Sequence, residues 1–120
     1  MNPNVRACIA YVAGRLILGK NSSSIFDYSQ SKHISLSGTV QERNVNVYDY
    51  DRSCHFHGSG SGGNFGLYDD GVSGHVDLKI NGNKFEGYDH SSSCHFEGTA
   101  RGNDISLYDF GDSAHFDFSF

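Results

Sequence analysis

The residues of this chain that could do chemistry are tyrosines and histidines that recur with a period of 20 residues. In each unit an aspartate directly follows the tyrosine, and a serine and then a histidine come a few residues later. The pairs are Tyr48 with His55, Tyr68 with His75, Tyr88 with His95, and Tyr108 with His115. An aromatic plane, a phenol hydroxyl and an imidazole that titrates near neutral pH are groups from which a binding site can be built.

These pairs have two explanations. If each tyrosine lies beside its histidine on the polar face of a sheet, the row of rings could stack against sugar rings or other flat small ligands. Cross-strand pairs of this kind also stabilise a sheet, by roughly 0.2–1 kcal/mol each. Their presence in every unit favours the structural role, because function usually breaks the symmetry of a repeat at one place. Carbohydrate or small-ligand binding by the tyrosine–histidine face is therefore the alternative hypothesis.

A second group of candidate residues is acidic. Asp77, Glu86 and Glu97 fall on one face and could form a metal site for a hard cation, or an enzymatic site. Lys79 and Lys84 lie nearby and would weaken the binding of a cation. The serine, histidine and aspartate of each unit repeat too evenly for a catalytic triad, which is a single constellation. The sequence therefore predicts a protein that is not an enzyme and has no cofactor.

Short strands must position these residues. Val45 and Val47 alternate with polar neighbours, which is typical of a half-buried strand. Asp49 to Ser53 then reads as a turn, in which the aspartate can accept hydrogen bonds from backbone amides two residues on, and the serine can do so more weakly. Asn81-Gly82 reads as a tight two-residue hairpin turn, and two such strands per unit give about ten.

The predicted fold is all-β, with hairpin repeats of roughly 20 residues forming an antiparallel meander of about ten strands, closed as a barrel or curled. A β-solenoid with one repeat per coil is the alternative. In the meander, the longer turn places Leu67 opposite Val76, and the Asn81-Gly82 turn places Ile80 opposite Asn83.

Residues 1–20 differ from the five-unit region, residues 21–120, whose first unit is a looser copy. Apolar residues at spacings of three and four predict a short amphipathic helix that covers the apolar face or an open end of the sheet. Asn4 is the predicted cap, and Gly19 the predicted end. These apolar residues are Val5, Cys8, Ile9, Val12 and Leu16.

Composition narrows the class of protein. A net charge of −5 argues against a nucleic-acid partner, and no apolar run reaches the roughly 18 residues of a membrane span. Three cysteines without a disulfide framework predict packing thiols in a reducing compartment, the cytoplasm. We interpret the chain as a structural or binding module that forms a homo-oligomer through open sheet edges and through Phe116, Phe118 and Phe120.

The face assignment predicts different costs for two alanine substitutions. Tyr88→Ala removes one member of the exposed row and should lower the free energy of unfolding by about 1 kcal/mol or less. Phe96→Ala should lower it by roughly 3–5 kcal/mol, because it removes a core side chain and leaves a cavity. Denaturant unfolding of both variants measures the difference. A larger loss for Tyr88→Ala would mean that the two faces are inverted.

Overall fold

The alternating pattern of residues 21–120 forms ten β-strands, and the apolar segment before it forms one helix. The computed structural model describes all residues, 1–120. The elements are α1 (Pro3–Leu18), β1 (Ser24–Asp27), β2 (Lys32–Val40), β3 (Asn44–Asp49), β4 (Cys54–Ser61), β5 (Asn64–Asp69), β6 (Gly74–Asn81), β7 (Lys84–Asp89), β8 (Cys94–Arg101), β9 (Asp104–Asp109) and β10 (Ala114–Ser119).

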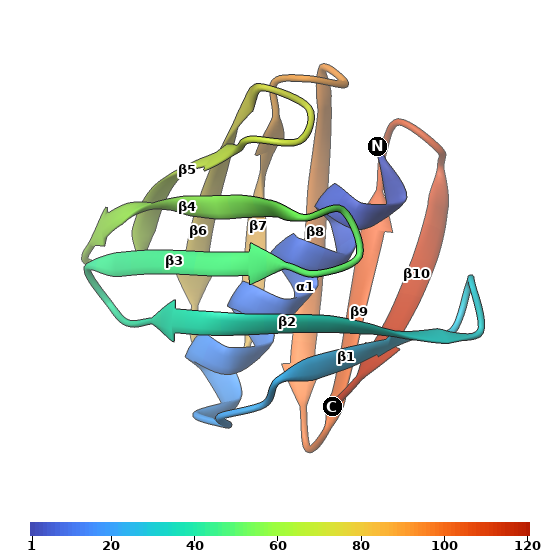
Figure 1. The fold of residues 1–120 in the computed structure, drawn as a ribbon, viewed down its shortest axis with the longest axis horizontal. Helices are drawn as coiled ribbons and strands as arrows, with labels where there is room; N and C mark the ends of the chain where they lie inside the picture. Colours follow the sequence, from blue (N-terminus) through green and yellow to red (C-terminus); the bar gives the residue numbers. More distant parts are fainter.

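The strands form an antiparallel meander that closes into a barrel, because β1 pairs with β10 (Figure 1). The predicted all-β meander is confirmed, and the solenoid alternative is wrong. Closure pairs both edge strands, so the open edges from which self-association was inferred do not exist. Phe118, which we expected at an interface with a second copy of the chain, is buried inside the barrel. Self-association itself stays a prediction.

Helix α1 lies inside the barrel (Figure 1). Every residue from Val5 to Gly14 is buried, so this stretch has no face toward solvent. The helix, predicted to cover the apolar face or an open end of the sheet, is enclosed by the barrel and covers its apolar inner face. Strands on several sides contact it, among them β1, β2, β6, β8 and β9. Asn2, not Asn4, caps the helix, and Gly19 ends it as predicted, with φ 66°. One cluster of 24 buried residues joins the helix and the strands.

The predicted register holds at the longer turn, where Leu67 lies opposite Val76. It is wrong at the shorter turn, where Ile80 lies opposite Phe85 and not opposite Asn83. The two central residues of that turn are Gly82-Asn83, because Gly82 has φ 62°. A type II′ hairpin turn requires this left-handed conformation at its first central position. The partner shifts by two residues, so every side chain keeps its predicted face.

One glycine recurs in each pair of strands joined by a short turn, at an inward-facing position. A Cβ on any of these glycines would overlap a carbonyl oxygen of the partner strand. In three of the pairs this glycine lies on the first strand, whereas in the pair β6 and β7 it lies on the second strand, as Gly87. We infer that the close approach bends the sheet toward closure. The cross-strand pairs are Gly38 with Val47, Gly58 with Leu67, Leu78 with Gly87, and Gly98 with Leu107.

Five fully buried aspartates form a ring at one end of the barrel, one at the end of each odd-numbered strand. They are Asp27, Asp49, Asp69, Asp89 and Asp109. One oxygen of each accepts the backbone N–H two residues on, at 2.8–3.2 Å, as the turn composition predicted. The serine four residues after each aspartate has φ between 51° and 56°. That left-handed conformation, uncommon outside glycine, redirects the chain into the next strand.

The second oxygen of each ring aspartate needs a partner, because a buried charge without one is strongly unfavourable. In three of the five turns, the side chain of the residue three positions after the aspartate donates a hydrogen bond to the carboxylate of that aspartate. Gln30, Arg52 and Ser92 do so at 2.6–2.7 Å. The sequence therefore supplies most turns with their own donor.

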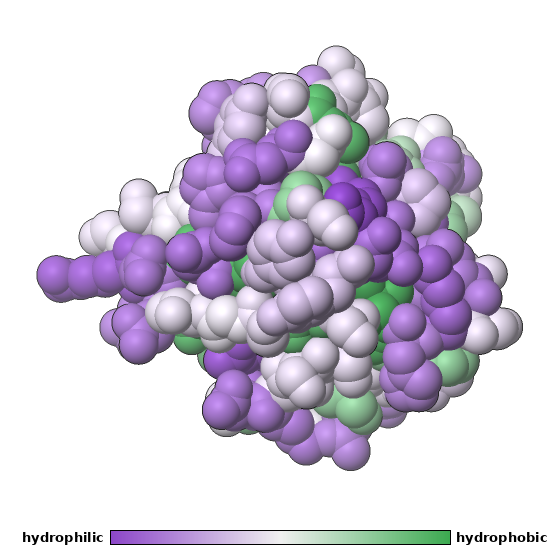
Figure 2. Space-filling view, in the orientation of Figure 1, coloured by the Kyte–Doolittle hydropathy of each residue, from purple (hydrophilic) through white to green (hydrophobic).

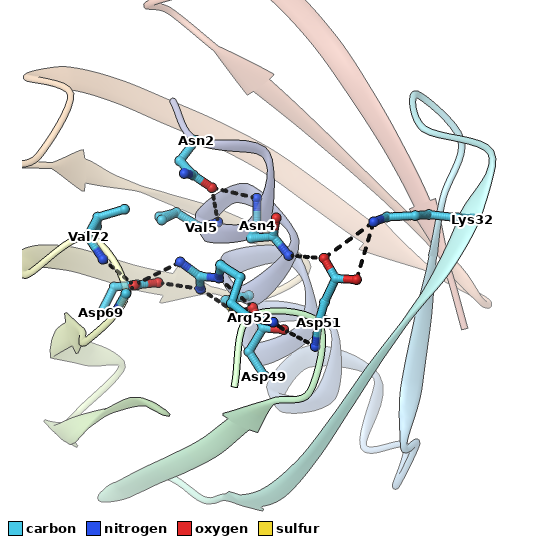
Figure 3. A network of polar contacts seen from close by, with 11 residues as sticks. Asn2, Asn4, Val5, Lys32, Asp49, Asp51, Arg52, Asp69 and Val72 are labelled. Carbon is cyan, nitrogen blue, oxygen red and sulfur yellow. Dashed lines mark hydrogen bonds and ion pairs between the residues drawn. The ribbon is translucent and has the colours of Figure 1, made fainter. Parts of the chain in front are cut away.

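In the other two turns this position holds Val72 or Asp112, whose side chains have no donor for the second oxygen, and arginines from elsewhere lie beside it instead. Arg52 extends past its own aspartate and donates to Asp69 at 2.7 Å (Figure 3). Arg6, in the first turns of the buried helix, lies 3.5 Å from Asp109. The ring thus ties neighbouring turns to each other and to α1.

Burial and hydrogen bonding shift the pKa values of groups at this end of the barrel. Burial raises the pKa of Asp109, but the backbone N–H of Gly111 and the amino group of Met1 lower it more, so the pKa lies below its usual value. Burial, followed by the charge of Asp49, holds the pKa of the Cys8 thiol well above its usual value. Cys8, Cys54 and Cys94 are all free thiols in the structure.

The side chains that point away from the core are mostly polar. Figure 2 shows a largely hydrophilic face, with apolar residues visible only in small areas between polar ones. This distribution agrees with the alternation along the strands, in which inward positions are buried and outward positions are exposed. No helix in the structure combines the length and the apolar character that crossing a membrane would take.

A first prediction from the fold concerns the inward glycines. Gly98→Ala places a methyl group against the carbonyl oxygen of Ser106 and the ring of Phe85, and should cost roughly 1–3 kcal/mol of stability through overpacking. Gly66→Ala is the matched control, because nothing lies within 4 Å of its Cβ position. Thermal or denaturant unfolding compares them. Equal effects of the two changes would contradict the bending role of the inward glycines.

A second prediction concerns Arg52. Arg52→Met keeps the apolar stem but leaves Asp49 and Asp69 without their shared guanidinium, and should cost roughly 3–5 kcal/mol. Arg43→Ala, at an exposed position, should change stability by less than about 0.5 kcal/mol. Denaturant unfolding near neutral pH measures both. A small effect of Arg52→Met would show that the ring does not depend on this guanidinium.

Candidate ligand-binding groove

The structure places each predicted tyrosine directly opposite its predicted histidine on the outer face of the barrel. In all four pairs the ring centroids are 4.7–4.9 Å apart, with the rings edge to face. The looser first unit repeats the contact with Phe26 and His33, at 4.8 Å. Equal geometry in every unit agrees with a structural role for the pair itself.

A further residue packs at the rim of the barrel in each unit, immediately after the ring aspartate. We call Tyr28, Tyr50, Asp70, His90 and Phe110 the rim residues. Each donates its backbone N–H to a carbonyl oxygen of a neighbouring strand, at 2.9–3.1 Å. Where the rim residue has a ring, it lies edge to face against the aromatic residue two positions earlier, at 4.8–4.9 Å. The rim residue therefore occupies an equivalent place in all five units.

Four of the five rim side chains hydrogen-bond to a residue on the neighbouring strand, each with different chemistry. The pairs are Tyr28 with Ser119, Tyr50 with Ser37, Asp70 with His57, and His90 with Asp77, at 2.8–3.2 Å. In the remaining unit the corresponding residues are Phe110 and Glu97. A phenylalanine cannot hydrogen-bond, so the carboxylate of Glu97 loses the partner that the other units provide.

Two adjoining hollows lie on the outer face beside this exception. The first, about 370 Å³, is lined by Tyr108 and His115. The second, about 910 Å³ and more open, is lined by Tyr88, His95 and Phe110. Lys79, Glu86 and Glu97 line both hollows. We therefore treat them as one surface, the outer groove.

Small outward-facing residues leave the space for the groove. Thr99 and Ser106 lie opposite each other across β8 and β9 in the first hollow. Gly66, without a side chain, lies in the second. Larger rings border these positions, including the half-exposed Phe110, of which 50% is accessible. The groove therefore has polar groups between aromatic borders, as many binding sites do.

The charges of the groove are uneven. Glu86 lies directly opposite Glu97 across β7 and β8, and Lys79 lies opposite Glu86 across β6 and β7. Neither glutamate forms an ion pair with a lysine, an arginine or a histidine. Lys79 and Lys84 also line the first hollow, so the two carboxylates lie in register with cations nearby but without a direct ion pair.

The acidic residues proposed for a metal or enzymatic site are brought together only in part. All three line the second hollow, but only Glu86 and Glu97 lie directly opposite each other, whereas Asp77 lies opposite Tyr88 and hydrogen-bonds to His90 at 2.8 Å. No group of three or more His, Cys, Asp or Glu side chains gathers in a way that could hold a metal ion. Two carboxylates supply fewer ligands than the six to eight oxygens that calcium takes.

The sequence interpretation missed Phe110, Thr99 and Ser106 as groove residues. A signal for Phe110 was present, because aligning the five units shows a hydrogen-bonding side chain after the aspartate in all the others. Thr99 and Ser106 gave no comparable signal, since small polar residues are common on the outer face of every strand. Their role depends on which neighbours the closed sheet places around them.

Comparison of the chain with protein-family models, with curated proteins and with solved structures gives no match. The fold and the groove alone therefore define the class: an antiparallel ten-stranded barrel filled by a helix, with an aromatic and acidic groove on its outer face.

Proposed function

We propose that the protein is a non-catalytic binding module that holds a carbohydrate in the outer groove. One observation carries the proposal: two of the tyrosine–histidine pairs line the outer groove and the other two do not. The lining pairs are Tyr88 with His95 and Tyr108 with His115, and the remaining pairs are Tyr48 with His55 and Tyr68 with His75. Because all four pairs have the same internal geometry, the difference lies in their surroundings.

The groove carries the groups that a sugar requires. Aromatic rings pack against the apolar C–H faces of pyranose rings. Hydroxyl groups need donors and acceptors, which Thr99, Ser106, Glu86 and Lys84 supply along the first hollow. A volume of about 370 Å³ falls in the range of small-molecule sites, and the more open second hollow suits an extended oligosaccharide better than a compact ligand.

A purely structural module is the second candidate. The observation that favours it is the occurrence of the tyrosine–histidine contact in every unit, inside and outside the groove. A binding module requires that only the tyrosine–histidine pairs inside the groove affect ligand binding, whereas a structural module requires no such difference. The pairs outside the groove have the same geometry and therefore serve as the control.

The proposal predicts a difference between Tyr108→Ala and Tyr48→Ala. A glycan array identifies an oligosaccharide that the protein retains, and calorimetry then measures its dissociation constant. Tyr108→Ala should weaken binding roughly tenfold or more, because it removes an aromatic surface under the sugar. Tyr48→Ala removes the same side chain from an equivalent pair outside the groove and should leave the dissociation constant unchanged.

Both variants should lose similar stability, since both lose one cross-strand pair. Equal weakening by the two variants would contradict binding in the groove. An array without any retained glycan would leave the structural module as the better explanation.

A further inference from the structure

The groove contains a cross-strand pair that lowers stability and that has no equivalent in the other units. At the equivalent outward position the other hairpins hold Asn46 opposite His57, Gly66 opposite Asp77, and Ser106 opposite Asp117. Only β7 and β8 place two carboxylates, Glu86 and Glu97, opposite each other. Like charges at directly opposite positions destabilise a sheet. The protein therefore carries an unfavourable interaction inside the outer groove.

The same unit departs from the repeat a second time, at the rim. An equivalent of Glu97 finds a hydrogen-bonding rim partner in each of the other four units. Here the partner is Phe110, and its ring lines the second hollow together with that of Tyr88. This exchange leaves a carboxylate unpaired and adds an aromatic face beside it. The two departures involve Glu86 on β7 and Phe110 in the turn after β9, and both act on Glu97.

Carboxylates without a counterion beside aromatic faces attract a cation. An ammonium group can donate to both glutamates, and rings within about 6 Å add cation–π attraction. A divalent metal ion fits less well, because no third acidic or histidine ligand converges there. Lys79 lies opposite Glu86 and reduces its charge, so Glu97 contributes most of the unbalanced charge.

Resting on the proposed function, we propose that the outer groove selects oligosaccharides that carry free amino groups, and that an ammonium binds between Glu86 and Glu97. The neutral hydroxyls of the same saccharide lie along Thr99, Ser106 and Lys84 in the first hollow. The uncompensated pair of carboxylates is then a binding feature retained at the expense of stability.

Three probes that differ only at one carbon of each sugar test this selectivity. They are β-1,4-linked tetramers of glucosamine, of N-acetylglucosamine and of glucose. Calorimetric titration at low salt and about pH 6 should show the amino tetramer binding at least roughly tenfold more tightly than the two neutral tetramers. Because exposed charges are screened by salt, this advantage should shrink in about 1 M salt.

Charge-neutralising variants locate the effect. Glu97→Gln should remove the preference, so that the amino tetramer binds no more tightly than the neutral tetramers. Asp117→Asn is the matched control, because it removes one charge from the equivalent position of β10, outside the groove, and should keep the preference. In unfolding experiments without ligand, Glu97→Gln should raise the denaturation midpoint, because the like-charge pair is gone.

The outcomes separate the two proposals. If the neutral tetramers bind in the groove as tightly as the amino tetramer, amine selectivity is overturned and the carbohydrate module stands. If Asp117→Asn weakens binding as much as Glu97→Gln does, the attraction is that of the whole acidic surface, which also overturns the selectivity. If neither these tetramers nor any arrayed glycan binds, both proposals fail. A preference lost only in Glu97→Gln supports both.

Discussion

The whole structure depends on the requirement that five buried carboxylates be hydrogen-bonded at one end of the barrel. Asp27, Asp49, Asp69, Asp89 and Asp109 have no exposed surface, so each must find donors within the protein. The backbone amides of the following turn satisfy one oxygen, which fixes the turn and ends the strand. Side chains hydrogen-bond to the other oxygen in four of the five turns. In the fifth, the second oxygen of Asp109 forms ion pairs with the amino group of Met1 at 3.3 Å and with Arg6 at 3.5 Å. Because Arg6 belongs to α1, this ion pair links the helix to the end of the barrel.

Much of the fold could be predicted from the sequence because the responsible forces are local. Alternation fixed the strands and their faces, and the spacing of Tyr88 and His95 fixed their cross-strand contact. The register at Gly82 was mispredicted by two residues, since the choice between adjacent two-residue turns depends on which residue must adopt a positive φ. That the barrel encloses the helix was harder still to predict from the sequence. It requires the sheet to close, and closure depends on one glycine per strand pair, whose partner is known only once the strands are in register.

The candidate site was predictable only in outline. The regular period drew attention to the four tyrosine–histidine pairs, which the structure confirms as neighbours. The same regularity hid the groove, because a groove arises where units differ. Glu97 and Phe110 are unremarkable when each is considered alone. In the equivalent positions of the two preceding units, His57 hydrogen-bonds to Asp70 and Asp77 to His90. Comparison with those pairs shows that the side chains of Glu97 and Phe110 form no such bond. Such a comparison needs the three-dimensional pairing, since the members of each pair are 13 residues apart in the chain.

The ring and the groove are physically connected through Asp109. Its carboxylate accepts the backbone N–H of Gly111 at 2.8 Å, which fixes the turn that begins with Phe110. Arg6 lies near Asp109 from within the barrel, and its guanidinium also lies 3.4 Å from the centre of the Phe116 ring on β10. The buried helix therefore supports, from behind, the turn that presents Phe110 to the groove. The need for a stable fold applies to every unit and explains the features that all units share. Features found in one unit alone, such as Phe110 and the Glu86–Glu97 pair, require a separate explanation. A groove whose adjoining turn is tied to the buried helix, and which differs from the other units at Phe110 and at the Glu86–Glu97 pair, agrees with the preorganised binding that we propose.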